Sequence, residues 1–202
     1  YVAGVITDEI EAALKANLQE PFPGADIEIQ TDLIAAARAV CGHSPGIATI
    51  LGTGSNSCQY DGEKIVRRVY SSGFILGDEG SGVSLGRAFL ADLVKGLVPK
   101  NVEDDFQKEF GLDYPQIVRK VYKEPAASAF MASFAPFIMK RIEHPYMYRL
   151  VYECLESFVV RALSRYSSDD EPFALKVGVV GSLGCACKEI LDKIGREHGL
   201  EF

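Results

Sequence analysis

Three glycine-rich segments carry the residues whose types and spacing could do chemistry. The first follows a short apolar run at 47–51 and consists of Gly52, Thr53, Gly54, Ser55 and Asn56. Glycines let a backbone approach a ligand closely, and consecutive backbone N–H groups can bind phosphate oxygens. We therefore expect a phosphate-binding turn here, with an ordinary glycine-containing hairpin as the alternative.

This first segment lacks the marks of two common nucleotide-binding motifs. Ser57 stands where G-x-G-x-x-G requires its third glycine, and the pair Asp61–Gly62 indicates a β-hairpin where that motif needs a helix. The motif G-x-x-x-x-G-K-[ST] is absent from the sequence. A phosphate-binding turn within a hairpin is instead similar to the way in which actin-like ATPases hold ATP.

The second glycine-rich segment, 77–82, places Asp78 and Glu79 between glycines. The glycines would let these carboxylates approach a small polar ligand. An ionised carboxylate accepts two hydrogen bonds, which suits a pair of sugar hydroxyls. The alternative is that both acidic residues only offset the dipole of the helix that follows.

The third segment, 178–184, joins an expected strand to an expected helix and contains Gly181, Ser182 and Gly184. A turn of this kind could admit an adenosine against the backbone, where no side chain intrudes. Glycine is common in strand-to-helix turns, so the third segment carries less weight than the first two.

Asp32 stands between an expected strand and an expected helix. Ligands of open α/β sheets collect at the C-terminal ends of strands, which favours a functional interpretation. There Asp32 could act as a general base that takes the proton from an attacking hydroxyl. The alternative is that Asp32 is a helix N-cap, a position that Asp often occupies.

The elements that would position these residues indicate an α/β fold. The N-terminal part alternates a strand at 1–6, a helix capped by Thr7 or Asp8, a strand at 26–30 and a helix at 33–40. Such alternation predicts parallel strands. The remaining expected elements are strands at 47–51, 58–60, 64–69 and 174–180, and helices at 87–97, 146–166 and 185–198.

Composition excludes several classes of protein. The 202 residues carry a formal net charge of −7 with a pI of about 5.1, which argues against a nucleic-acid partner. No run of about 18 apolar residues suggests a membrane span, and no secretory signal is visible. Five cysteines without such a signal favour the cytoplasm. Cys185 and Cys187 form a single C-x-C pair without a second cluster, so we assign no metal site.

Taken together, the segments 30–32, 51–57, 77–81 and 179–182 resemble N-acetylglucosamine kinases and the related BadF/BadG/BcrA/BcrD-type ATPases. LGTGSN followed about twenty residues later by LGDEGSG is more specific than either loop alone. The resemblance implies an α/β actin-like ATPase fold, which is ribonuclease H-like. It also implies two lobes, with 1–43 the remainder of an N-terminal lobe and 44–202 a C-terminal lobe with a helical insertion.

The resemblance also implies roles for single residues. Asp32 would be the catalytic base, and the ATP phosphates would be bound by Gly52, Thr53, Gly54 and Ser55. The sugar would be bound by Gly54, Asn56 and Asp78. The adenosine would be bound by Gly181, Ser182 and Gly184.

The sequence departs from the family pattern in two places. Ser72–Gly73 stands where animal N-acetylglucosamine kinases have a Trp-Gly pair that packs on the sugar. The first phosphate loop of the family, an Asp-Gly-Gly-Thr-like hairpin whose Asp orients the metal, has no counterpart. We therefore expect the chain to be a fragment of a longer enzyme of this type.

The expected function is ATP-dependent phosphorylation of an amino sugar such as N-acetylglucosamine, with ATP and Mg²⁺ as cofactors and a small-molecule sugar as the partner. We expect no nucleic acid and no membrane, and a homodimer is left open. One alternative is a BadF-type activator ATPase that couples ATP hydrolysis to electron transfer through an iron–sulfur cluster. Another is a non-catalytic nucleotide-binding fragment.

Overall fold

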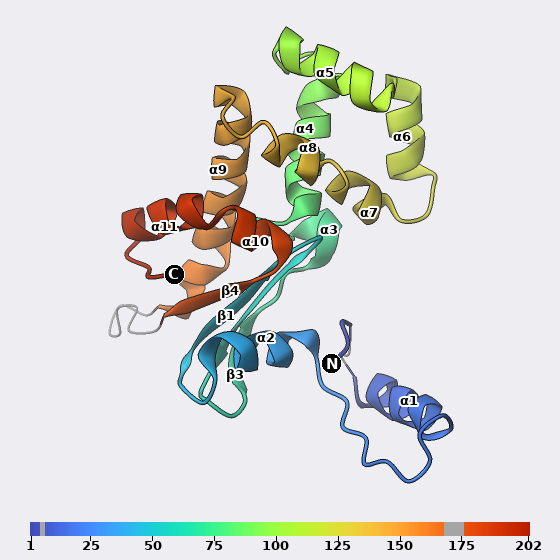
Figure 1. Cartoon of the computed structure of the whole chain (residues 1–202), viewed down its shortest axis with the longest axis vertical. Helices are drawn as coiled ribbons and strands as arrows, with labels where there is room; N and C mark the ends of the chain where they lie inside the picture. The colour runs from blue at the N-terminus through green and yellow to red at the C-terminus, as the bar shows by residue number, and fades with distance from the viewer. Residues whose placement is uncertain (5–6, 168–175) are drawn as a thin grey trace.

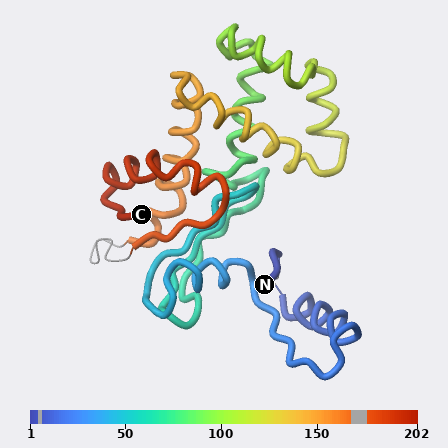
Figure 2. The backbone as a smooth tube through the Cα atoms, viewed as in Figure 1, coloured from blue at the N-terminus to red at the C-terminus, as the bar shows by residue number. Residues whose placement is uncertain are grey.

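The computed structural model describes residues 1–4, 7–167 and 176–202 (Figures 1 and 2). Its centre is a four-stranded mixed sheet in the order β3-β2-β1-β4. The strands are β1 (Gly46–Leu51), β2 (Ser55–Tyr60), β3 (Ile65–Val69) and β4 (Val177–Val180). Strand β1 pairs antiparallel with β2 and parallel with β4, and β2 pairs antiparallel with β3. The expected hairpin around 61–62 is confirmed, and its first strand begins earlier, at Ser55.

Helix α2 (Asp32–Cys41) covers one face of the sheet. Its small and branched apolar residues, with Leu33 and Ala37 fully buried, pack on Ala48, Cys58 and Tyr60 of the strands. Burial of this apolar surface fixes the helix on the sheet. Residue 32 at the start of α2 is thereby held near the end of β1 where the first glycine segment begins.

The opposite face carries the helices of the segment between β3 and β4, together with the C-terminal helices (Figure 1). They are α3 (Gly73–Leu76), α4 (Gly82–Val94), α5 (Lys100–Phe110), α6 (Tyr114–Tyr122), α7 (Ala127–Ala132), α8 (Ala135–Met139), α9 (Pro145–Arg161), α10 (Ser182–Ala186) and α11 (Lys188–Glu197). A cluster of buried phenylalanines that includes Phe89, Phe106 and Phe137 joins α4, α5 and α8. This core fixes α4, the helix that follows the second glycine-rich segment, against α5 and α8.

The N-terminal segment differs most from the sequence-based expectation. Helix α1 (Asp8–Gln19) forms with Thr7, one of the two expected caps, but none of its residues is buried. The expected strands at 1–6 and 26–30 are reduced, within the described residues, to one parallel bridge between Val2 and Thr31. Tyr1 and Val2 are exposed, so the expectation of a buried strand is wrong for the part that is described. A strand needs hydrogen-bond partners for its backbone groups, and here each of the two segments pairs with the other through a single residue.

The bounds of several later elements also differ from the expectation. Helix α4 begins at Gly82, five residues before the expected start, because Ser81 caps it by accepting a hydrogen bond from the Ser84 amide. The long apolar stripe at 146–166 is confirmed as α9 followed by a 3₁₀ helix at Leu163–Tyr166. The expected single helix at 185–198 is two helices, α10 and α11, which meet at Cys187. The expected strand at 174–180 begins at Val177, and residues 174–175 lie outside the described part.

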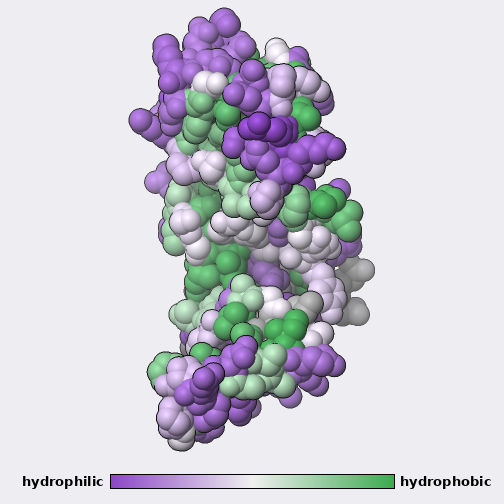
Figure 3. Space-filling model, turned by 90° about the vertical axis from the view of Figure 1, so that its right-hand side faces the viewer, coloured by the Kyte–Doolittle hydropathy of each residue, from purple (hydrophilic) through white to green (hydrophobic). Residues whose placement is uncertain are grey.

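The surface varies in polarity along the molecule. Figure 3 shows hydrophilic side chains over the end formed by α5, whereas apolar side chains gather around the narrower middle of this face. Across 1–4, 7–167 and 176–202, every helix is too short or too polar to cross a lipid bilayer.

Candidate active site

The first glycine segment, 52–54, connects β1 to β2 and is anchored on the start of α4. The Gly82 amide donates to the Gly52 carbonyl at 2.8 Å, and the Val83 amide donates to the Thr53 carbonyl at 3.0 Å. The Gly52 amide donates to the Gly54 carbonyl at 3.0 Å, which closes the turn. The amides of Thr53 and Gly54 have no hydrogen-bond partner among the described residues. Two consecutive unpaired N–H groups in a fixed turn form a site that suits phosphate oxygens.

Asp78 lies directly beneath this turn. The Ser55 amide donates to Asp78 Oδ1 at 3.2 Å, and a Cβ on Gly54 would lie 3.3 Å from both carboxylate oxygens. Asp78 is only 9% exposed and has a left-handed backbone with φ 56°. Burial raises the pKa of the Asp78 carboxyl, and the hydrogen bond from Ser55 opposes that shift. In this arrangement the carboxylate supports the turn, and Asp78 is not among the residues that line the larger cavity.

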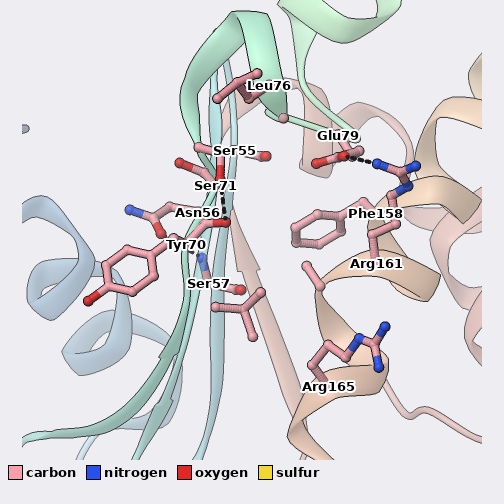
Figure 4. Close-up of a pocket in the computed structure, with 14 residues that line it drawn as sticks. Ser55, Asn56, Ser57, Tyr70, Ser71, Leu76, Glu79, Phe158, Arg161 and Arg165 are labelled. Atoms are coloured by element: carbon pink, nitrogen blue, oxygen red, sulfur yellow. Dashed lines mark hydrogen bonds and ion pairs between the residues drawn. The ribbon is translucent and has the colours of Figure 1, made fainter.

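The neighbouring acidic residue has a different role. Glu79 forms an ion pair with Arg161 of α9 at 3.0 Å (Figure 4). This pair joins the second glycine segment to α9 near the end of that helix. Because the Arg161 side chain is well exposed, the ion pair contributes little to stability.

Asp32 lies in a cavity of about 590 Å³ that the first glycine segment also lines. The cavity brings together the predicted residues Asp32, Gly52, Thr53, Gly54, Ser55 and Asn56. The N-cap of α2 is Thr31, whose Oγ1 accepts a hydrogen bond from the Ile34 amide at 3.3 Å. The alternative in which Asp32 serves as that cap is therefore wrong. Its carboxylate is available to the cavity.

A second cavity, of about 260 Å³, lies on the other side of the same turn. Gly52 and Thr53 line both cavities. The remaining lining residues of the second cavity are Gly82, Ala132, Ala135, Pro136, Met139, Ser182, Leu183 and Ala186. These small and apolar side chains suit the flat face of a nucleobase or a ribose.

Of the three residues predicted to contact adenosine, the structure places only Ser182 at this second cavity. Gly181 has φ 105°, and a Cβ there would lie 2.3 Å from the carbonyl oxygen of Leu51. A Cβ on Gly184 would lie 2.5 Å from Val179 Cγ1. Both glycines therefore let the start of α10 pack closely on β1 and β4, and neither is among the residues that line this cavity.

Sequence reasoning missed the wall that α7 and α8 contribute, because Ala132, Ala135 and Pro136 belong to no recognisable motif. It also missed Arg68 of β3 and Tyr70 just after that strand, which line the larger cavity. The expected hairpin could have indicated them, because it pairs Arg68 with Cys58, close to the glycine turn.

The cysteine pair does not form a chelating site. Cys187 is buried with its Sγ 3.7 Å from Met139 Sδ, whereas Cys185 is exposed. Burial raises the pKa of the Cys187 thiol to about 12. The described residues include no group of three or more His, Cys, Asp or Glu side chains placed to hold a metal ion.

Similarity to solved structures connects this geometry to known proteins. The chain matches a putative N-acetylglucosamine kinase from Porphyromonas gingivalis with a TM-score of 0.94 and 40% sequence identity, over 100% of this chain and 70% of that protein. It also matches a putative N-acetylglucosamine kinase from Chromobacterium violaceum with a TM-score of 0.71 and 24% identity, over 98% and 70% of the two chains. No protein-family model and no curated protein matches the chain.

The fold is therefore that of the actin-like ATPases, in the form found in kinases, as the sequence predicted. Within that class, the chain belongs to the N-acetylglucosamine kinase-like family.

Proposed function

We propose that the protein transfers the γ-phosphoryl group of ATP to a hydroxyl of an amino sugar such as N-acetylglucosamine. The observation that carries this proposal is the turn at 52–53, which forms a wall of both cavities. A nucleoside in the smaller, apolar cavity would direct its phosphates across the turn. A sugar in the larger cavity would then lie beside Asp32.

The chain's own residues account for the main steps. The unpaired amides of Thr53 and Gly54 would bind phosphate oxygens, where charge spreads during transfer. Asp32 would accept the proton of the sugar hydroxyl while the oxygen of that hydroxyl bonds to the γ-phosphorus. The bond from the γ-phosphorus to the bridging oxygen breaks, and ADP leaves with that electron pair.

The fit to Mg²⁺ is limited. Mg²⁺ in such enzymes is held by one or two carboxylates together with substrate phosphates. Among the described residues that line the larger cavity, Asp32 supplies the only carboxylate, and no cluster of three candidate ligands occurs in the described part of the chain. The ATP phosphates would therefore supply most of the metal's ligands.

The direct test is a sugar screen with the full-length protein. ADP release would be measured with ATP alone and with N-acetylglucosamine, N-acetylmannosamine, glucosamine or glucose, and the sugar phosphate would be identified by mass. We expect ADP release to depend on an added amino sugar. Release of ADP at the same rate without any sugar would contradict a kinase and would favour an ATPase of the BadF type.

The Asp32→Asn variant supplies the matched control for that screen. It should retain the fold, because Thr31 and not Asp32 caps α2. Sugar-dependent ADP release that disappears in this variant would exclude a contaminating kinase.

A further inference from the structure

Arg68 lines the larger cavity together with Gly54 and Asn56, two of the three residues predicted to bind the sugar. It pairs with Cys58 across β2 and β3. Alternation along the strands places Asn56, Cys58, Arg68 and Tyr70 on the face that α2 covers. Figure 4 shows Asn56 and Tyr70 extending to one side of the strands and Arg161 and Arg165 lying on the other. Arg68 and Asp32 line the same cavity from β3 and α2.

One N–H donor of the Arg68 guanidinium lacks a hydrogen-bond acceptor among the described residues. Its Nε is buried and has no hydrogen-bond partner among the described residues. Arginine remains charged and can only donate, so a buried guanidinium N–H without an acceptor is unfavourable. The Tyr70 ring, whose centroid is 5.9 Å from the Arg68 Cζ, contacts the cation but accepts no hydrogen bond from Nε. Arg68 itself lines the cavity, so a ligand oxygen there could accept a hydrogen bond from its guanidinium.

The position of Arg68 along the strand indicates which part of a ligand it would meet. Asn56 is next to Ser55, at the end of β2 that adjoins the glycine turn. Arg68 lies opposite Cys58, three residues further along β2 than Ser55. Arg68 therefore faces the part of the cavity remote from the phosphate-binding turn.

We propose that Arg68 is a specificity residue that donates a hydrogen bond to the acyl carbonyl of an N-acetylated amino sugar. This inference rests on the proposed sugar-kinase function. The oxygen of an acyl carbonyl can accept a hydrogen bond from the charged guanidinium of Arg68. A free amino sugar would instead bring an ammonium group towards the guanidinium, and like charges repel. Arg68 thus favours N-acetylglucosamine over glucosamine.

The test compares sugar binding by wild-type full-length protein and two Arg68 variants. Calorimetric titration with N-acetylglucosamine, with glucosamine and with ATP gives three separate affinities. Arg68→Met should weaken N-acetylglucosamine binding roughly tenfold or more, since a hydrogen bond to a charged group is lost. It should leave ATP binding unchanged and should not weaken glucosamine binding. Arg68→Lys keeps the charge without the Nε donor and should give an intermediate loss, which preserves the test if Arg68→Met does not fold.

Arg67→Met is the matched control, because Arg67 is the exposed neighbour on the opposite face of β3 and the variant changes the net charge equally. Its binding of all three ligands should equal that of the wild type. Equal losses for both sugars and ATP in Arg68→Met, or no loss at all, would overturn the inference, as would a wild-type protein that binds no sugar. If the wild type binds N-acetylglucosamine in an Arg68-dependent way but releases no ADP, the proposed kinase function fails and the recognition role stands.

Discussion

The backbone amide of Ser55 donates a hydrogen bond to Asp78 Oδ1 at 3.2 Å, and this contact joins two segments that are 23 residues apart. It holds the end of the turn at 52–54 on the loop that precedes α4. The first residue of α4, Gly82, donates its amide to the Gly52 carbonyl. The two most specific sequence segments thus form one hydrogen-bonded unit.

Replacement of Asp32 by Asn should lower kcat by about 10²-fold or more, because loss of a general base costs that much, and should leave ATP affinity nearly unchanged. Steady-state kinetics and ATP titration measure the two effects. The matched control is Thr31→Ala, which removes the cap of α2 and should cost about 1 kcal/mol of stability with little direct effect on kcat. An Asp32→Asn protein with nearly full activity would exclude Asp32 as the base.

Asp78 should make stability depend on pH in the acid range. Burial raises its folded-state pKa above the ordinary value of 3.8, so the folded protein holds this proton more tightly than the unfolded chain. The resulting stabilisation is complete below pH 3.8 and is lost as the pH rises through the raised folded-state value. Urea unfolding of wild type and Asp78→Asn between about pH 3 and 7 should show this difference in slope. Parallel curves for the two proteins would show that Asp78 is not the group responsible.

Two glycines should respond to alanine in opposite ways. Gly181→Ala would place a Cβ 2.3 Å from the Leu51 carbonyl oxygen at a left-handed φ, so we expect a clear loss of thermal stability. A Cβ on Gly52 meets no atom within 4 Å, so Gly52→Ala should retain its stability. Because Gly52 faces both cavities, Gly52→Ala should instead weaken ATP binding. A reversed result, with Gly52→Ala unstable and Gly181→Ala intact, would contradict this placement of the turn.

The two thiols of the C-x-C pair should react at very different rates. Cys185 is exposed, whereas Cys187 is buried and its pKa is raised to about 12. Since the thiolate is the reactive form, iodoacetamide at about pH 8 should label Cys185 first and leave Cys187 intact until the protein unfolds. Peptide mass spectrometry after timed quenching measures both rates. Comparable labelling of Cys187 in the folded protein would contradict the described packing against Met139.

The sequence predicted the turn at 52–54 and the hairpin that follows because glycine positions and the Asp61–Gly62 pair act locally. It also predicted that a helix begins near Asp32, because a helix start is a local signal. It could not predict that 26–30 would form no regular strand, since strand pairing depends on distant partners. The apolar wall formed by Ala132 and Pro136 likewise depends on tertiary packing.

The turn shared by the two cavities also has a thermodynamic consequence. A ligand that displaces the peptide units at 52–53 from one side would change the free energy of binding on the other side. Linkage then requires reciprocity: nucleotide must alter the affinity for sugar by the same factor as sugar alters the affinity for nucleotide. Through the shared turn, each of the two substrates would thus change the affinity of the protein for the other before phosphoryl transfer begins.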